Sequence, residues 1–244
     1  MSRSVTRPSH RRKARRRAGR SRHSDVLTRR QILFQGAAAG VAPLLRPVSL
    51  AHAADRDTLR FRALWQGTSI GEHQVAFRRE GDRLTVETQI DITARFLFFN
   101  LFRLQHAARE VWLADRLVSV TSTTNHDGVR IEVSGEAIEG GFRIVGEDGP
   151  FLAAADLLTS NSLWNSRIVH ETRLIDVQHG GEVGLVARPL GNEQIVTPQG
   201  RIDARRYQLI TPYYAGSVFY DADERWVKAL VELKGETLEY VSAP

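Results

Sequence analysis

Residues 84–94 read LTVETQIDITA, and this stretch decides the fold class of the chain. Every second position carries Leu, Val, Thr, Ile or Ala, and the positions between them carry Thr, Glu, Gln or Asp. A repeat of two puts successive side chains on opposite faces of a strand, whereas a helix would need a repeat of about 3.6. The stretch therefore predicts a β-strand with one buried face and one face in water.

The segments on both sides of this strand repeat the same alternation between tight turns. Alternating apolar residues run from 59 to 77 and resume after 105, with turns such as Glu80-Gly81-Asp82 and His126-Asp127-Gly128 between the runs. Short runs joined by such turns predict about a dozen strands in a single antiparallel meander. Helix formers cluster at residues 153–161, which predict one short helix, followed by a loop at 162–165 and a strand at 167–178.

An all-β chain of this kind favours a strongly curved sheet or a closed barrel, since closure removes exposed sheet edges. A sandwich is the alternative. An outer-membrane barrel is not expected, because its lipid-facing side should be apolar with aromatic girdles, and these strands are rich in Thr and Ser. No loop between residues 54 and 244 is long or low in complexity, so one β-barrel-like domain is expected there. The absence of cysteine excludes disulfides and thiolate metal sites.

The N-terminal part of the chain has the pattern of a twin-arginine export signal. Arg29 and Arg30 follow Thr28 and precede an apolar run, which ends before the small-x-small pattern of Ala51 and Ala53. Cleavage is expected after Ala53, with residues 1–53 as the signal peptide and its basic n-region. The expected partners are the twin-arginine translocase and signal peptidase, and the expected location is the periplasm. An uncleaved membrane anchor is the alternative, although a spanning helix needs about 20 consecutive apolar residues.

The positive charge of the chain is confined to this signal. The net charge is +6, from 34 Lys and Arg against 28 Asp and Glu. Residues 1–53 hold 13 of the bases and one of the acids, which leaves 21 bases and 27 acids, a net charge of −6, for the rest. A mildly acidic domain argues against a nucleic-acid partner.

Three longer segments resemble a known family. They are GTSIGEHQVAFRREGDRLTVET at 67–88, LWNSRIVHETRLIDVQHGGEV at 163–183 and SVFYDADERWVKALVELKGETLEYV at 217–241. Their order and their glycine turns resemble a family of exported bacterial proteins known only as a domain of unknown function. The resemblance covers nearly all of residues 58–241 and implies a β-rich fold, which is distantly similar in topology to periplasmic lipid-handling half-barrels. It implies no activity.

The sequence contains no pattern that selects a catalytic or metal site. No two histidines of the domain stand at a spacing that a strand or helix could use to bind a metal, and no cofactor motif is present. No Gly-x-Ser-x-Gly nucleophile motif is present either. An envelope enzyme acting through carboxylates or histidine stays open as an alternative function, with His170, Asp176 and Asp221 as its candidate residues.

Binding of an apolar or amphipathic ligand, or of a partner at the cell envelope, is the first functional hypothesis. Small-molecule pockets combine an apolar lining with a few polar groups, and two aromatic segments could supply such a lining for a lipid-like ligand. The alternative is that these side chains fill the core. The candidate ligand-lining residues are Phe96, Phe98, Phe99, Phe102, Trp164 and Asn165.

Overall fold

The computed structural model describes residues 56–96, 99–233 and 235–243, which form an all-β fold. Thirteen strands belong to one antiparallel sheet, and β9 and β10 form a separate hairpin. Two 3-10 helices, η1 and η2, precede that hairpin. The elements are β1 (Arg56–Trp65), β2 (Thr68–Glu80), β3 (Arg83–Phe96), β4 (Phe99–Leu113), β5 (Arg116–His126), β6 (Val129–Ile138), β7 (Gly141–Gly146), β8 (Gly149–Ala153), η1 (Ser162–Trp164), η2 (Ser166–His170), β9 (Arg173–Ile175), β10 (Glu182–Gly184), β11 (Val186–Thr197), β12 (Gly200–Ile210), β13 (Ala215–Tyr220), β14 (Trp226–Leu233) and β15 (Glu236–Ser242).

The sheet is open, although the first and last strands of the chain pair with each other. Strand β1 lies between β2 and β15, with Phe61 opposite Ser242 and Trp65 opposite Leu238. Pairing of the first strand with the last is the step that closes an up-and-down barrel. Here the two unpaired edges are β8 and β11, strands from the middle of the chain. The expectation of a strongly curved sheet is thus the correct one, and that of a closed barrel is wrong.

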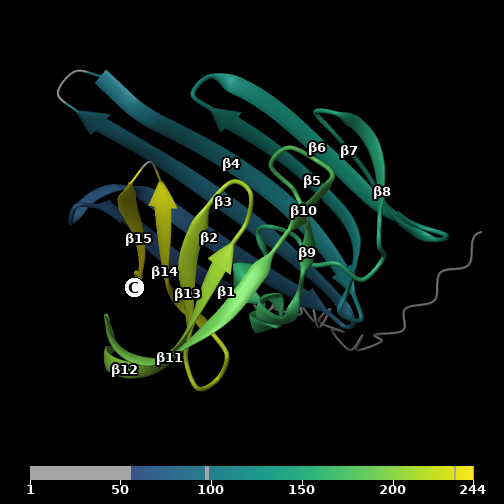
Figure 1. Ribbon diagram of the computed structural model, residues 1–244. Helices are drawn as coiled ribbons and strands as arrows, with labels where there is room; N and C mark the ends of the chain where they lie inside the picture. The colour runs from purple at the N-terminus through teal and green to yellow at the C-terminus, as the bar shows by residue number, and fades with distance from the viewer. Residues whose placement is uncertain (1–55, 97–98, 234, 244) are drawn as a thin grey trace, which may run out of the picture. The chain divides into compact units, whose positions relative to one another are not determined.

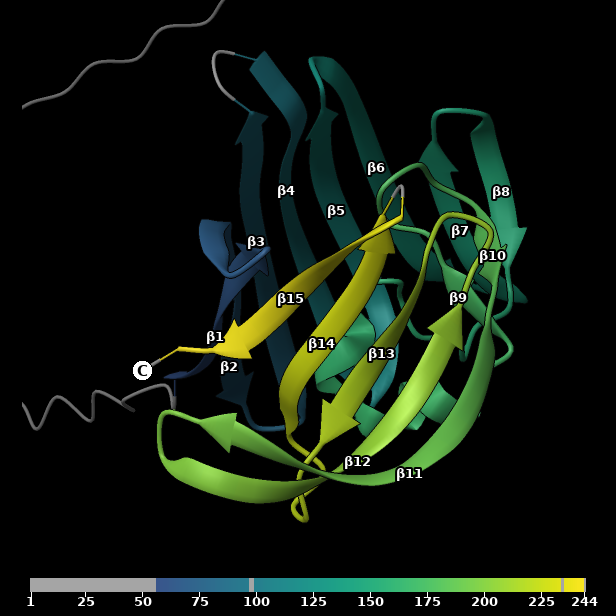
Figure 2. The ribbon, with the colours of Figure 1, turned by 60° about the vertical axis from the view of Figure 1, so that its left-hand side comes forward.

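Residues 154–185, here called the inner segment, connect these two edges through the concave side of the sheet. In Figure 1 the small hairpin and the 3-10 turns lie between the N-terminal and C-terminal strands. Figure 2 shows the same turns between β11–β15 in front and β4–β8 behind. Leu158, Ile168 and Leu174 of this segment are fully buried in one core with side chains from both halves of the sheet. The sheet therefore encloses its own connecting segment as filling.

The alternation predicted for residues 84–94 is confirmed. Val86, Thr88, Ile90 and Ile92 are buried on the concave face, and the acidic and amide side chains between them are exposed. Thr85 is the exception, because it is buried although it lies between the core positions. Strand periodicity therefore identified the face of β3 that lines the interior.

The predicted helix at residues 153–161 is wrong, and the strand predicted over 167–178 is confirmed only for Arg173–Ile175, which form β9. The structure has turns at 155–156, and the helical turns come later, over Ser162–Trp164 and Ser166–His170. Tertiary contacts override the helix propensity here. Leu157 and Leu158 enter the core, and the backbone of Leu158 accepts a hydrogen bond from Ile175 instead of continuing a helix.

The expectations of a membrane anchor and of an export signal concern the N-terminal part of the chain. Among the described residues no helix is long and apolar enough to cross a bilayer. The signal residues Arg29, Arg30, Ala51 and Ala53 lie outside the part of the chain that the structure describes.

Candidate functional site

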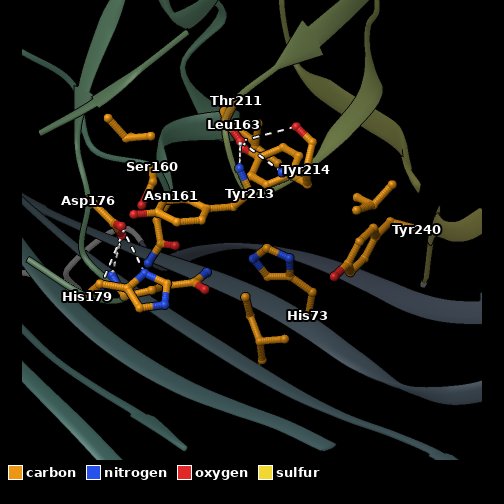
Figure 3. Close-up of a pocket in the computed structure, with 14 residues that line it drawn as sticks. His73, Ser160, Asn161, Leu163, Asp176, His179, Thr211, Tyr213, Tyr214 and Tyr240 are labelled. Atoms are coloured by element: carbon orange, nitrogen blue, oxygen red, sulfur yellow. Dashed lines mark hydrogen bonds and ion pairs between the residues drawn. The ribbon is translucent and has the colours of Figure 1, made fainter. Parts of the chain in front are cut away.

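A cavity of about 140 Å³ lies between the inner segment and the concave face of the sheet. The sheet contributes side chains from β2, β3, β14 and β15, and the loop between β12 and β13 contributes two tyrosines (Figure 3). The volume is close to that of engineered protein cavities of about 150 Å³ that bind one benzene molecule. The lining residues are His73, Ile90, Ser160, Asn161, Leu163, Asp176, Gln178, His179, Val183, Thr211, Tyr213, Tyr214, Val231 and Tyr240.

His73 is a lining residue with an unsatisfied buried polar atom. It lies on β2 opposite Ile90 and is 5% exposed. Its ring packs edge-on against Trp226 and Tyr240, with centroids 5.1 and 5.4 Å away. Nε2 is buried and has no hydrogen-bond partner among the described residues. Burial, assisted by the charge of His106, lowers the pKa of His73 to about 3. The imidazole is therefore neutral at physiological pH, with one nitrogen available as a hydrogen-bond acceptor.

His106 holds Asn161 of the inner segment against the sheet. Asn161 Nδ2 lies 2.8 Å from His106 Nε2, and Thr124 Oγ1 lies 2.8 Å from His106 Nδ1. An amide nitrogen only donates, so Nε2 accepts and the proton is on Nδ1, which donates to Thr124. Burial lowers the pKa of His106 to about 4, although the charge of Asp176 opposes this. In Figure 3 the side chains of Asn161 and His73 face each other across the cavity.

Asp176 is the carboxylate of the cavity, and it also organises the turn in which it lies. Its Oδ1 accepts hydrogen bonds from the backbone nitrogens of Gln178 and His179, and its Oδ2 accepts from His179 Nδ1 at 2.9 Å. Tyr213 lies against the His179 ring with the centroids 5.0 Å apart. Asp176 itself is 4% exposed. The turn therefore presents a buried carboxylate flanked by aromatic rings.

A glycine contact fixes the position of this turn. The backbone nitrogen of Glu147 donates to the carbonyl of His179 at 2.8 Å. Gly146 and Gly180 meet so closely that a Cβ on Gly180 would lie 2.5 Å from the Cα of Gly146. Gly180 also has a φ of +91°, which other residues rarely adopt. Only glycine allows this approach, which ties the carboxylate turn to the β7–β8 hairpin.

A second buried polar network, next to the cavity, anchors the inner segment. Glu110 on β4 is fully buried, and its Oε1 accepts from Thr159 Oγ1 at 2.7 Å while Oε2 accepts from Trp112 Nε1 at 2.9 Å. Thr159 also shares a hydrogen bond of 2.9 Å with Ser162 Oγ. Burial raises the pKa of Glu110 to about 7, against the two side-chain hydrogen bonds. Two strand residues, His106 and Glu110, thus hold residues 159–162 in place.

The described lining of the cavity contains an acidic side chain but no lysine or arginine. Of the described residues that line it, Asp176 is the one acid, and none is a lysine or arginine. Burial, with a contribution from the charge of Asp176, raises the pKa of Tyr214 to about 12, so its hydroxyl stays neutral. Across the described ranges, no three His, Cys, Asp or Glu side chains are grouped so that they could hold a metal ion. The lining offers hydrogen bonds and a negative charge to a ligand.

Comparison with known families assigns nearly the whole sheet to one family. The model of a family described as "Domain of unknown function (DUF6134)" matches residues 61–243. This chain belongs to the DUF6134 family. This confirms one part of the resemblance seen in the sequence, namely that the chain belongs to a β-rich family of unknown function. The segments that carried it contain His73, Asp176 and His179, so motifs that read as hairpins and turns also supply the cavity.

A solved structure with a similar fold is known for comparison with this DUF6134 domain. It is the crystal structure of a beta-barrel-like protein of a domain of unknown function, DUF1849, from Brucella abortus. The TM-score is 0.55 at 7% sequence identity, and the match covers 78% of this chain and 96% of that chain. At this identity the likeness concerns the fold alone. A search of curated proteins finds no match.

Two of the aromatic residues predicted to line a pocket, Phe102 and Trp164, pack against other rings in the DUF6134 domain. Phe102 packs against His126 at 5.1 Å, and Trp164 packs edge-on against Phe77 and Trp112 at 5.4 and 5.8 Å. Neither lines the cavity described above. Asn165 caps η2 by accepting a hydrogen bond from the backbone nitrogen of Arg167, and it lines a separate cleft. The side chains of Phe96, Phe98 and Phe99 lie outside the described residues.

The three candidates for catalysis are not brought together in the cavity. Asp176 lines it, whereas His170 is exposed and lines the separate cleft, beside Glu224. Asp221 organises the turn after β13, where its Oδ1 accepts from the backbone nitrogens of Asp223 and Arg225. His179, in the turn after Asp176, has a side chain that is 34% exposed and lies 2.9 Å from the Asp176 carboxylate.

The sequence contained a signal for the residues that this reasoning missed. His106, Ala108, Glu110 and Trp112 share one face of β4, because they follow one another at a spacing of two positions. A histidine and a glutamate at the same alternate positions of a strand as a buried tryptophan indicate polar side chains that face the core. Their partners could not be read in the same way, since Thr159 and Asn161 lie on an irregular segment.

Proposed function

We propose that this DUF6134 domain is a binding protein without catalytic activity, and that it holds a small amphipathic ligand in the cavity between His73 and Asp176. The observation that carries the proposal is the unpartnered Nε2 of His73 in the lining. Buried polar atoms in proteins nearly always have a partner. A ligand hydroxyl or amine in the cavity would donate the missing hydrogen bond, and its apolar part would contact Ile90, Leu163 and Val231.

The volume limits the size of the ligand group. A cavity of about 140 Å³ accommodates a group of the size of one benzene ring. A long acyl chain would not fit inside it. The lipid-like ligand expected from the sequence is therefore narrowed to a small amphipathic molecule, or to the head of a larger one.

Binding of 3,3-dimethyl-1-butanol tests the proposal, because this alcohol combines a hydroxyl donor with a compact apolar body. We expect chemical-shift changes at the His73 side-chain nitrogens in ¹⁵N NMR spectra on titration of the alcohol. Val231→Phe should fill the cavity and abolish these changes. Val227→Phe is the matched control, since it places the same side chain on the same strand but in the small cluster around Phe219. Unaltered binding to Val231→Phe would show that the ligand is held elsewhere.

We further propose that the domain works in the periplasm after export by the twin-arginine translocase and cleavage after Ala53. The support is the sequence pattern around Arg29 and Arg30, together with the restriction of the basic residues to the first 53 positions. Residues 54–244 carry the net charge of −6 and contain every described residue of the cavity.

A further inference from the structure

The charges and rings around the cavity carry information about the class of its ligand. The lining contains the Asp176 carboxylate, three tyrosines and two histidines, without a lysine or arginine among its described residues. An anionic ligand would meet the negative charge of Asp176, and no lysine or arginine among the described lining residues offsets that charge. Desolvation of an anion in such a cavity is unfavourable without a paired positive charge. The lining thus disfavours carboxylates and phosphates.

The aromatic residues favour the opposite charge. Tyr213, Tyr214 and Tyr240 contribute three phenol rings to one small cavity (Figure 3). The negative π-face of such rings attracts cations, and clusters of them recognise quaternary ammonium groups. A quaternary ammonium ion is larger and more weakly hydrated than a metal ion, so it loses less on leaving water. Among the described residues no group of three side chains could hold a metal ion. The carboxylate and the rings are the features of the lining that would attract an organic cation.

We infer that the ligand of the cavity is a small organic ammonium ion, bound by the carboxylate of Asp176 and the rings of Tyr213, Tyr214 and Tyr240. This inference rests on the proposed function and names the ligand class for the same cavity. Asp176 supplies the charge, and its carboxylate accepts one hydrogen bond from His179 Nδ1. His73 supplies the acceptor for a hydroxyl or N–H group on the same ligand.

The comparison of choline with 3,3-dimethyl-1-butanol tests the inference. The two molecules share the hydroxyl and the branched head, and they differ in a positively charged nitrogen against a neutral carbon. We expect the full-length protein to bind choline at least fivefold more tightly than the neutral alcohol, and to bind 3,3-dimethylbutyrate, which is negatively charged, more weakly than either. Titrations followed by NMR measure all three dissociation constants under the same conditions.

Two pairs of variants assign the effect to named side chains. Asp176→Asn removes the charge but keeps an oxygen that can accept from the backbone of the turn, so the choline preference should fall to less than twofold. Asp221→Asn is the matched control, since Asp221 caps a turn through the same kind of backbone contacts outside the cavity. Tyr213→Leu should weaken choline binding severalfold, whereas Tyr213→Phe should retain it. Tyr213 is 61% exposed, so neither change should affect folding.

The outcomes separate this inference from the proposed function. Equal affinity for choline and the neutral alcohol, both abolished by Val231→Phe, would overturn the inference and leave the binding cavity in place. Tighter binding of 3,3-dimethylbutyrate would also overturn it. If neither choline nor the alcohol binds the wild-type protein, both proposals fail. Retention of the choline preference in Asp176→Asn would overturn the role given to that carboxylate.

Discussion

Replacement of Glu110 by glutamine should change how the stability of the domain depends on pH. Glu110 is fully buried, and burial raises its pKa from an ordinary value of 4.5 to about 7. The folded protein therefore binds a proton more tightly at this site than the unfolded chain does. Above pH 4.5 the free energy of unfolding falls as the pH rises, until the site is ionised in the folded state as well, near pH 7.

The size of this effect follows from the difference between the pKa of Glu110 in the folded protein and its ordinary value, which is about 2.5. A difference of one in pKa corresponds to about 1.36 kcal/mol of free energy. Ionisation of Glu110 thus lowers the free energy of unfolding by about 3 kcal/mol in total. About 2 kcal/mol of that falls between pH 5.5 and pH 8. Glutamine has no charge to bury. Its amide can donate to Thr159 while its oxygen accepts from Trp112, so it imitates the protonated acid.

Urea unfolding of the wild type and Glu110→Gln at pH 5.5 and pH 8 measures the effect. Between pH 5.5 and pH 8, the free energy of unfolding of the variant should rise by about 2 kcal/mol relative to that of the wild type. His73 and His106, whose pKa values burial lowers, favour the folded state at higher pH in both proteins, so they cancel in the difference. Parallel pH profiles for the two proteins would refute the assignment of a raised pKa to Glu110.

The remaining predictions concern the carboxylate turn and the export signal. Gly181→Ala should cost about 1–2 kcal/mol in urea unfolding, from its φ of +99° alone, because no atom lies within 4 Å of the added Cβ. Gly180→Ala should cost about 1–3 kcal/mol more, since its Cβ would meet Gly146, and it should also weaken choline binding; equal costs for the two variants would contradict the close approach. Arg29→Lys combined with Arg30→Lys should leave the precursor uncleaved in the cytoplasm of the native host, as judged by fractionation and gel mobility, and normal export of this double variant would rule out the twin-arginine assignment.

The sequence determined the strands of this protein and their inner faces. Strand β3 could be predicted almost residue by residue, because the period of two depends on local backbone geometry and on a single buried face. Turns with glycine could be predicted for the same reason, since the backbone conformation at Gly81 and Gly128 is a local requirement. The separation of the basic residues from the acidic domain needed only a count along the chain.

The tertiary structure alone decided where the sheet opens and what lies inside it. Residues 153–161 have helix-forming side chains, but buried partners far along the chain, such as Glu110 and Ile175, hold them in an irregular path. The cavity combines residues separated by up to 167 positions, from His73 to Tyr240, and no local pattern encodes that meeting. The turn after Asp176 is positioned by Gly146 of the β7–β8 hairpin, which is distant in the sequence. Local sequence fixes local backbone geometry and polarity, whereas a site built across the interior depends on which segments the open sheet encloses.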